Sequence, residues 1–178
     1  MKIKKLEHLS EIFKEYDAFI IDLWGVMHNG VNLYNSAVRA VRELQTKGKR
    51  IVFLSNAPRP KKKVVEFLKK MKMEDKFLRN VFTSGEAALN SLKQNKFGKK
   101  FYHLGPQRDD SLYIDVKENK TTLEESDFIL CTGLFDEESE NLQFYKDLLK
   151  NYVNKKLVCT NPDPVSYTHL RAHETRED

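Results

Sequence analysis

Polar residues follow three predicted strands, each at the point where the apolar run of the strand ends. Asp22 ends the first run, the pair Ser55 and Asn56 the second, and the pair Thr83 and Ser84 the third. A carboxylate in such a position can hold Mg²⁺ or act as a nucleophile. A serine hydroxyl beside backbone N–H groups can cradle a phosphate. The combination predicts that a carboxylate and a hydroxyl-plus-amide pair face one crevice from neighbouring strands, although spacing alone names no reaction.

Each of these residues also has a purely structural interpretation. An aspartate after a strand often begins a turn or caps a helix, and Ser-Asn before a proline is a common way to start a turn. The joint pattern nevertheless favours a binding site, because ligands of open parallel sheets bind beyond the carboxyl ends of the strands.

Alternating periodicities predict the elements that position these residues. The continuous apolar run 18–21 is typical of a strand buried on both faces, run 51–54 of a second buried strand, and residues 81–82 of a third. Helical patterns lie around them, over 2–15, from Asn35 or Ser36 to Gly48, from about Pro60, and over 86–93. This alternation predicts a parallel sheet with right-handed crossovers, a doubly wound α/β fold.

A second set of elements follows a plausible boundary near residue 99. It comprises strands at 101–104, 128–131 and 156–160 and a helix near 139–152. We therefore divide the chain into a core domain, 1–98, and part of a second α/β unit, 99–165. The last segment, 166–178 (SYTHLRAHETRED), has no lysine and no apolar period. It resembles a translated adaptor, and we interpret it as a non-native tail; a genuine polar tail is the alternative.

Composition excludes several classes of protein. The chain has 178 residues, 40% of them hydrophobic and 32% charged, which is typical of a globular protein. Its length corresponds to about one domain, or to one domain plus a fragment of another. Its apolar runs are far shorter than the roughly 18 residues that a membrane span needs. Its two cysteines, Cys131 and Cys159, lack the spacing of a metal site. We expect a reduced cytoplasmic protein with no membrane partner.

The formal net charge of +5 raises the question of nucleic-acid binding. The densest basic cluster lies within 61–72, where apolar residues recur at helical spacing between the lysines. This pattern is typical of an amphipathic helix with a lysine-rich solvent face. We therefore expect no nucleic acid among the partners; binding through this face would make affinity steeply dependent on salt.

Four segments in order resemble the haloacid dehalogenase (HAD) superfamily, most closely its NagD-like class IIA branch of sugar-phosphate and nucleotide phosphatases. They are Asp22–Gly30 (DLWGVMHNG), Leu54–Pro58 (LSNAP), Phe82–Leu89 (FTSGEAAL) and Thr160–Asp163 (TNPD). The resemblance covers residues 17 to about 164. It implies a Rossmann-like core, here incomplete, with part of an α/β C2-type cap from residue 99.

The resemblance also implies roles for individual residues. Asp22 matches the nucleophile, which forms an aspartyl-phosphate and ligates the Mg²⁺ cofactor, and the backbone carbonyl of Trp24 matches a second metal ligand. Ser55 matches the residue that hydrogen-bonds the phosphoryl group, with Asn56 adding its backbone amide. The implied reaction is hydrolysis of a phosphoric monoester.

The cap is implied to select the substrate. Asn161 and Asp163 match the cap motif that faces the active site. The implied partner is a small phosphorylated metabolite, and members of this class often pair two copies through the cap.

The first departure from the family concerns proton transfer. Phosphatases of this superfamily carry an acid–base aspartate two residues after the nucleophile, where this chain has Trp24. Positioned acid–base catalysis is typically worth about 10² to 10⁴ in rate. We therefore expect slow hydrolysis of alkyl phosphates. The nearby His28 could titrate near neutrality, but such a histidine is more often a loop or packing residue.

The second departure is that the third-motif lysine and fourth-motif acidic residues have no match after Asp163. We expect this polypeptide to be a truncated, inactive form of a Mg²⁺-dependent HAD hydrolase. The alternative is a non-catalytic binding protein that keeps the crevice but lost turnover with the acid at position 24.

Overall fold

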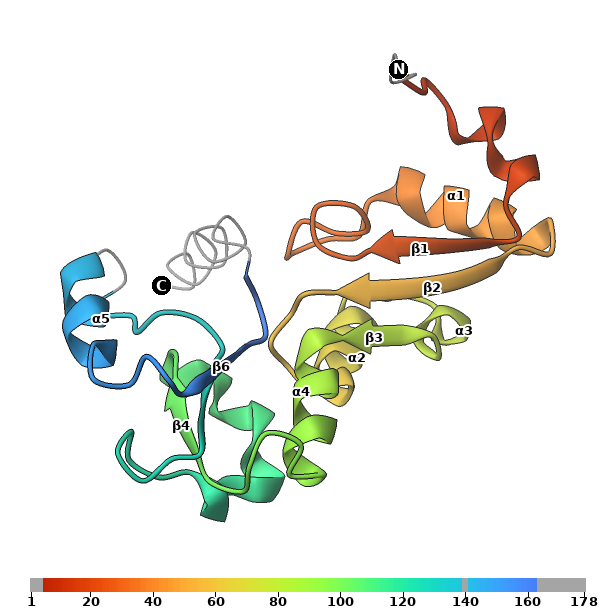
Figure 1. Cartoon of the computed structure of the whole chain (residues 1–178). Helices are drawn as coiled ribbons and strands as arrows, with labels where there is room; N and C mark the ends of the chain where they lie inside the picture. The colour runs from red at the N-terminus through yellow and green to blue at the C-terminus, as the bar shows by residue number, and fades with distance from the viewer. Residues whose placement is uncertain (1–4, 139–140, 163–178) are drawn as a thin grey trace. The chain divides into compact units, whose positions relative to one another are not determined.

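The computed structural model describes residues 5–138 and 141–162, and these divide into two compact units (Figure 1). Of the described residues, the first unit comprises 5–55 and Val65–Phe82, and the second comprises Asn56–Val64, 83–138 and 141–162. Each unit contains one three-stranded sheet. The predicted tail 166–178 lies outside the described residues.

The sheet of the first unit has the order β1-β2-β3. Strand β1 (Ala18–Asp22) runs parallel to β2 (Arg50–Ser55), in a register that pairs Ala18 with Arg50 and Asp22 with Leu54. The remaining elements are β3 (Val81–Thr83), α1 (Asn35–Thr46), α2 (Lys61–Lys70) and α3 (Asp75–Leu78). The predicted strands are therefore confirmed.

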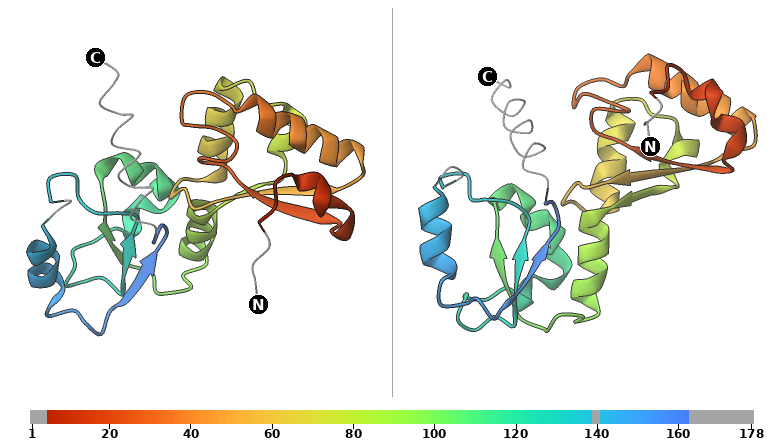
Figure 2. Two further views of the ribbon diagram at one scale, coloured as in Figure 1. Left: turned by 90° about the horizontal axis from the view of Figure 1, so that it is seen from above. Right: turned by 45° about the horizontal axis from the view of Figure 1, so that its top comes forward.

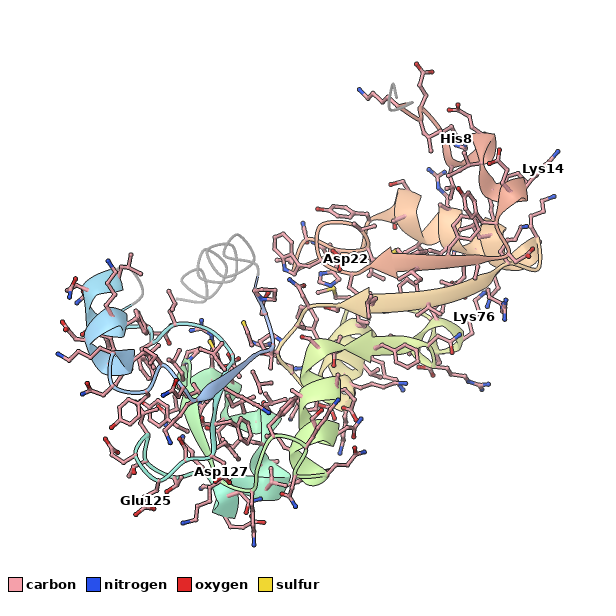
Figure 3. All side chains as sticks on the ribbon, viewed as in Figure 1. His8, Lys14, Asp22, Lys76, Glu125 and Asp127 are labelled. Atoms are coloured by element: carbon pink, nitrogen blue, oxygen red, sulfur yellow. The ribbon has the colours of Figure 1, made fainter. Side chains whose placement is uncertain are left out.

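The predicted helix over 2–15 is wrong in its described part. Two single turns of 3₁₀-helix, η1 (Leu9–Glu11) and η2 (Phe13–Glu15), stand there instead, near the labelled His8 and Lys14 in Figure 3. Ile12 lies between them with φ −126° and ψ −11°, outside the helical region, so the helix does not propagate. Helix α1 also differs slightly, because Tyr34 rather than Asn35 or Ser36 occupies its N-cap.

Strand β1 is not buried on both faces. On one face of the sheet, Ile51 and Phe53 of β2 are buried, at 7% and 0% exposure. On the opposite face, Leu54 of β2 is 51% exposed, and Ile20 of β1, which pairs with Val52, is 72% exposed. Among the described residues, therefore, only one face of this sheet is well buried. A continuous apolar run does not distinguish this arrangement from burial on both faces.

Substitutions on the two faces should differ greatly in their effect on stability. Phe53→Ala should lower the free energy of unfolding by about 3–5 kcal/mol, because it empties a fully buried site. Ile20→Thr should change it by no more than about 0.5 kcal/mol, because the side chain is already in water and threonine favours strands. Urea unfolding followed by circular dichroism measures both. A loss above about 2 kcal/mol for Ile20→Thr would contradict the exposed face.

The second unit contains a parallel sheet of order β4-β5-β6, whose strands lie side by side in Figure 2. The strands are β4 (Phe101–Leu104), β5 (Phe128–Cys131) and β6 (Lys156–Cys159). Around them lie α4 (Ser84–Lys93), α5 (Leu142–Leu149) and the 3₁₀ segments η3 (Gln107–Leu112) and η4 (Ile114–Asn119). Residues 139–140 of the predicted helix 139–152 lie outside the described residues.

Two apolar clusters cover this sheet. In the first, Leu89 of α4 and Leu112 of η3 pack with Phe128 of β5. In the second, Tyr145 of α5 packs with Leu104 and Ile129 of the sheet. Residues of β5 are consequently buried in both clusters, which is the doubly covered arrangement predicted for an α/β fold.

Parallel strands with flanking helices confirm the predicted α/β fold class. Helix α4 belongs to the second unit, because its apolar side chains pack there. The division into a core at 1–98 and a cap at 99–165 stays a prediction. Over the part of the chain described, no helix is both long and apolar enough to cross a membrane.

Candidate functional site

Asp22 and Ser55 lie at the same edge of the first sheet. Asp22 is the last residue of β1, at the arrowhead in Figure 3, and pairs with Leu54, so Ser55 is one residue further along β2. Neighbouring strands are about 4.8 Å apart. Because side chains alternate between faces, the carboxylate of Asp22 is exposed whereas Ser55 is only 7% exposed. The structure therefore brings these two predicted residues to one edge.

The loop after Asp22 is held by its own backbone. The Leu23 N–H donates to Asp22 Oδ1 at 2.7 Å, and the Leu23 carbonyl accepts from Met27 N at 2.8 Å. Leu23 and Met27 are each 1% exposed, so they anchor the loop in the core. Gly25 adopts φ +76°, a left-handed conformation that glycine tolerates without strain. These contacts position the Trp24 peptide next to the carboxylate.

His28 stabilises the same loop. Its ring is 4% exposed and packs edge-on against Phe67, with the ring centroids 5.6 Å apart. Its Nδ1 accepts the Gly30 N–H at 3.0 Å, which places the proton of the neutral ring on Nε2. Burial lowers the pKa of His28, and the negative charge of Asp22 opposes this only in part. The geometry thus favours the packing role over a proton-transfer role.

The donors at the edge of the first sheet fit Mg²⁺ in kind. A carboxylate and a backbone carbonyl are oxygen ligands of the type that Mg²⁺ prefers. Within residues 5–138 and 141–162, no three His, Cys, Asp or Glu side chains gather as a metal centre. Asp22 and Trp24 would therefore provide only part of a coordination shell.

Two further predicted residues meet in the second unit. Asn56 Nδ2 donates to Asn161 Oδ1 at 3.0 Å, across 105 positions of the chain. Asn161 follows Thr160, whose N–H donates to the Cys131 carbonyl at 2.9 Å and extends the pairing of β5 with β6. The prediction gave Asn56 a role through its backbone amide and did not foresee this side-chain contact. Asp163 lies outside the described residues.

Thr83 and Ser84 hold the loop that follows Ser55. Thr83 Oγ1 donates to the Arg59 carbonyl at 2.8 Å and accepts from Glu86 N at 3.0 Å, which caps α4. Ser84 Oγ donates to the Ala57 carbonyl at 3.0 Å. The hydroxyls thus have structural partners. The Thr-x-x-Glu spacing of a helix N-terminus was the available signal for this role.

The absence of a side chain at Gly85 allows the start of α4 to lie close to the backbone of Ala57 and Arg59. Its N–H donates to the Ala57 carbonyl at 3.1 Å, and a Cβ placed on it would lie 2.3 Å from the Arg59 nitrogen. Glu86 Oε2 accepts the Lys61 N–H at 2.9 Å, which tethers the far end of the loop. The segment FTSGEAAL therefore positions the loop that begins after Ser55.

Gly85→Ala should destabilise the protein by about 1–3 kcal/mol, because the added methyl group collides with backbone that has no room to move. The matched control is Asn90→Ala, an exposed position of the same helix, where better helix propensity should leave stability unchanged or slightly higher. Urea unfolding measures both. Equal stability of the two variants would show that the Arg59 backbone yields.

The chain belongs to the haloacid dehalogenase-like hydrolase family. The family profile with that description matches residues 19–117, more than half of the chain. This confirms the family indicated by the motifs at Asp22–Gly30 and Leu54–Pro58. No curated protein gives a significant match.

Solved structures of this family have a similar fold. A haloacid dehalogenase-like hydrolase from Brucella suis 1330 is 30% identical with a TM-score of 0.74, over 89% of this chain and 60% of its own. Glycerol phosphate phosphatase from Mycobacterium tuberculosis in complex with magnesium is 21% identical, TM-score 0.57, over 86% and 46%. NagD from E. coli K-12 is 18% identical, TM-score 0.58, over 90% and 66%. The chain thus spans about three fifths of the Brucella protein.

Proposed function

We propose that this chain is part of a Mg²⁺-dependent phosphatase that acts on a small phosphorylated metabolite through Asp22. The observation that supports this most directly is the pairing of Asp22 with Leu54, which brings Asp22 and Ser55 to the same end of the sheet in a member of a hydrolase family. Glycerol phosphate phosphatase, a structural neighbour, was solved with magnesium.

In the proposed reaction, the Asp22 carboxylate attacks phosphorus and the bond from phosphorus to the leaving oxygen breaks. The Leu23 N–H on Oδ1 orients the carboxylate and leaves Oδ2 for the attack. The Ser55 hydroxyl donates a hydrogen bond to a phosphoryl oxygen, and water then hydrolyses the aspartyl-phosphate. Bound Mg²⁺, held partly by Asp22 and the Trp24 carbonyl, would offset the charge of the phosphate.

The Trp24 side chain limits this chemistry. An indole neither donates nor accepts a proton at neutral pH, so the leaving oxygen departs without help from this position. A substrate with a good leaving group, such as an acyl phosphate, depends least on that help. The second candidate function, a binding protein without turnover, is favoured by the same observation.

The remaining assignments belong to the same proposal. Residues 99–165 form part of the cap, which selects the substrate through Asn161 and Asp163 and pairs two copies of the protein. The protein acts in the cytoplasm. In this proposal the third- and fourth-motif groups complete the metal site, and turnover depends on them.

Asp22→Asn should abolish Mg²⁺-dependent hydrolysis of acetyl phosphate by the protein encoded in full, because an amide does not attack phosphorus. Phosphate release measures the rate, and mass spectrometry of quenched wild type should detect one phosphoryl group on the peptide that contains Asp22. The control is Asp17→Asn, an exposed aspartate before β1, which should keep the wild-type rate. An unchanged rate in Asp22→Asn would remove Asp22 as the nucleophile.

Trp24→Asp should raise the rate on alkyl phosphates by about 10²- to 10⁴-fold, the usual contribution of a positioned acid and base. The rate on acetyl phosphate should change far less, because its leaving group needs little protonation. A steady-state comparison of the two substrates measures this difference. Wild type that binds phosphate esters and turns over neither substrate, together with activity in Trp24→Asp, would favour the binding protein.

A further inference from the structure

The two cysteines of the chain end neighbouring strands in the second unit. Cys131 is the last residue of β5 and Cys159 the last residue of β6, and the two are direct partners in the parallel register. Paired residues project from the same face, and neighbouring strands lie about 4.8 Å apart. This spacing falls within the range of about 4.4–6.8 Å between the Cα atoms of disulfide-bonded cysteines.

Both cysteines are free thiols at paired positions of neighbouring strands. Cys131 also donates from Sγ to the Gly133 carbonyl at 3.6 Å. Cys159 is exposed whereas Cys131 is half-buried, so a reagent in solution meets Cys159 first.

We propose that Cys131 and Cys159 are a dithiol modification site that closes to a disulfide by exchange with a low-molecular-weight disulfide such as oxidised glutathione. The Cys159 thiolate attacks one sulfur of the reagent, which forms a mixed disulfide and releases one glutathione thiolate. The Cys131 sulfur then attacks Cys159 Sγ, expels the second glutathione and completes the bond between the strands. Two protein thiols are oxidised and one glutathione disulfide is reduced to two thiols.

The electrostatics set the order and pH dependence of these steps. Burial, and secondly the charge of Cys159, raise the pKa of Cys131 to about 12, so this sulfur is protonated at neutral pH and attacks slowly. The closing step should accelerate as pH rises, because a larger fraction of the Cys131 thiol is then ionised.

The disulfide would constrain the end of β6, from which the chain continues to Asn161. The Cys131 carbonyl accepts hydrogen bonds from Thr160 N at 2.9 Å and from Thr160 Oγ1 at 3.3 Å. Asn161 follows directly and contacts Asn56. A covalent link between Cys131 and Cys159 would thus fix the strand end from which Asn161 extends. This inference does not depend on the proposed phosphatase activity.

The test incubates the 178-residue protein with oxidised glutathione at several pH values and follows accessible thiols with a chromogenic disulfide, with peptide mapping by mass spectrometry. Wild type should lose both thiols, retain no glutathione, and yield a peptide pair linked through Cys131 and Cys159, faster at higher pH. Cys131→Ser should instead retain one glutathione on Cys159, and Cys159→Ser should react far more slowly.

Wild type overturns the proposal if it keeps a stable mixed disulfide, or links two chains through Cys159, under conditions that modify Cys131→Ser. Retention of both free thiols in wild type would overturn it as well. The wild-type peptide map decides the matter by itself, so a variant that fails to fold does not block the test. Thiol counts in denaturant, before and after reduction, verify that oxidation is reversible.

Discussion

The parallel register between β1 and β2 is the constraint on which the candidate site depends. Asp22 pairs with Leu54, and this pairing brings the carboxylate and Ser55 to one edge. A slip by one residue would turn every side chain of one strand to the opposite face. The buried Phe53 opposes such a slip, because its ring would leave the core for water. Burial of Phe53 thus stabilises the register, and the register in turn places Asp22 and Ser55 at the same end of the sheet.

The loop that leaves β2 is stabilised by a different kind of interaction. Three groups at the start of α4 donate to its backbone carbonyls, from Thr83, Ser84 and Gly85. Hydrogen bonds of this kind need close approach, and the missing Cβ of Gly85 permits it. The motif segment Phe82–Leu89 therefore stabilises the loop that continues from the motif segment Leu54–Pro58.

In the proposed phosphatase, turnover depends on the side chain at position 24 and on the metal ligands. The backbone around Trp24 is well anchored, with the neighbouring Leu23 in the core, so in this proposal the indole itself, and not the loop conformation, limits proton transfer. His28 does not replace the missing acid, because its Nδ1 is used by Gly30 and burial disfavours its charged form. In the proposed reaction, therefore, the carboxylate of Asp22 is present at the strand end, whereas neither Trp24 nor His28 provides proton transfer.

The sequence by itself determined the α/β class, the strands and the family, because apolar periodicity and local motifs such as DLWGVMHNG are written in consecutive residues. It also located Asp22 and Ser55 at strand ends. It did not separate a strand exposed at Ile20 from one buried on both faces, since exposure depends on what packs against it.

Only the tertiary structure decided the pairings between distant residues. The contact of Asn56 with Asn161, the use of Thr83 and Ser84 as supports, and the register that joins Cys131 to Cys159 all depend on how strands align. The structure also decided that the helix expected over 2–15 does not form, because the non-helical backbone of Ile12 separates two single turns. Each of these outcomes is set by contacts between separate segments or by local backbone geometry, and neither is visible in the spacing of residue types.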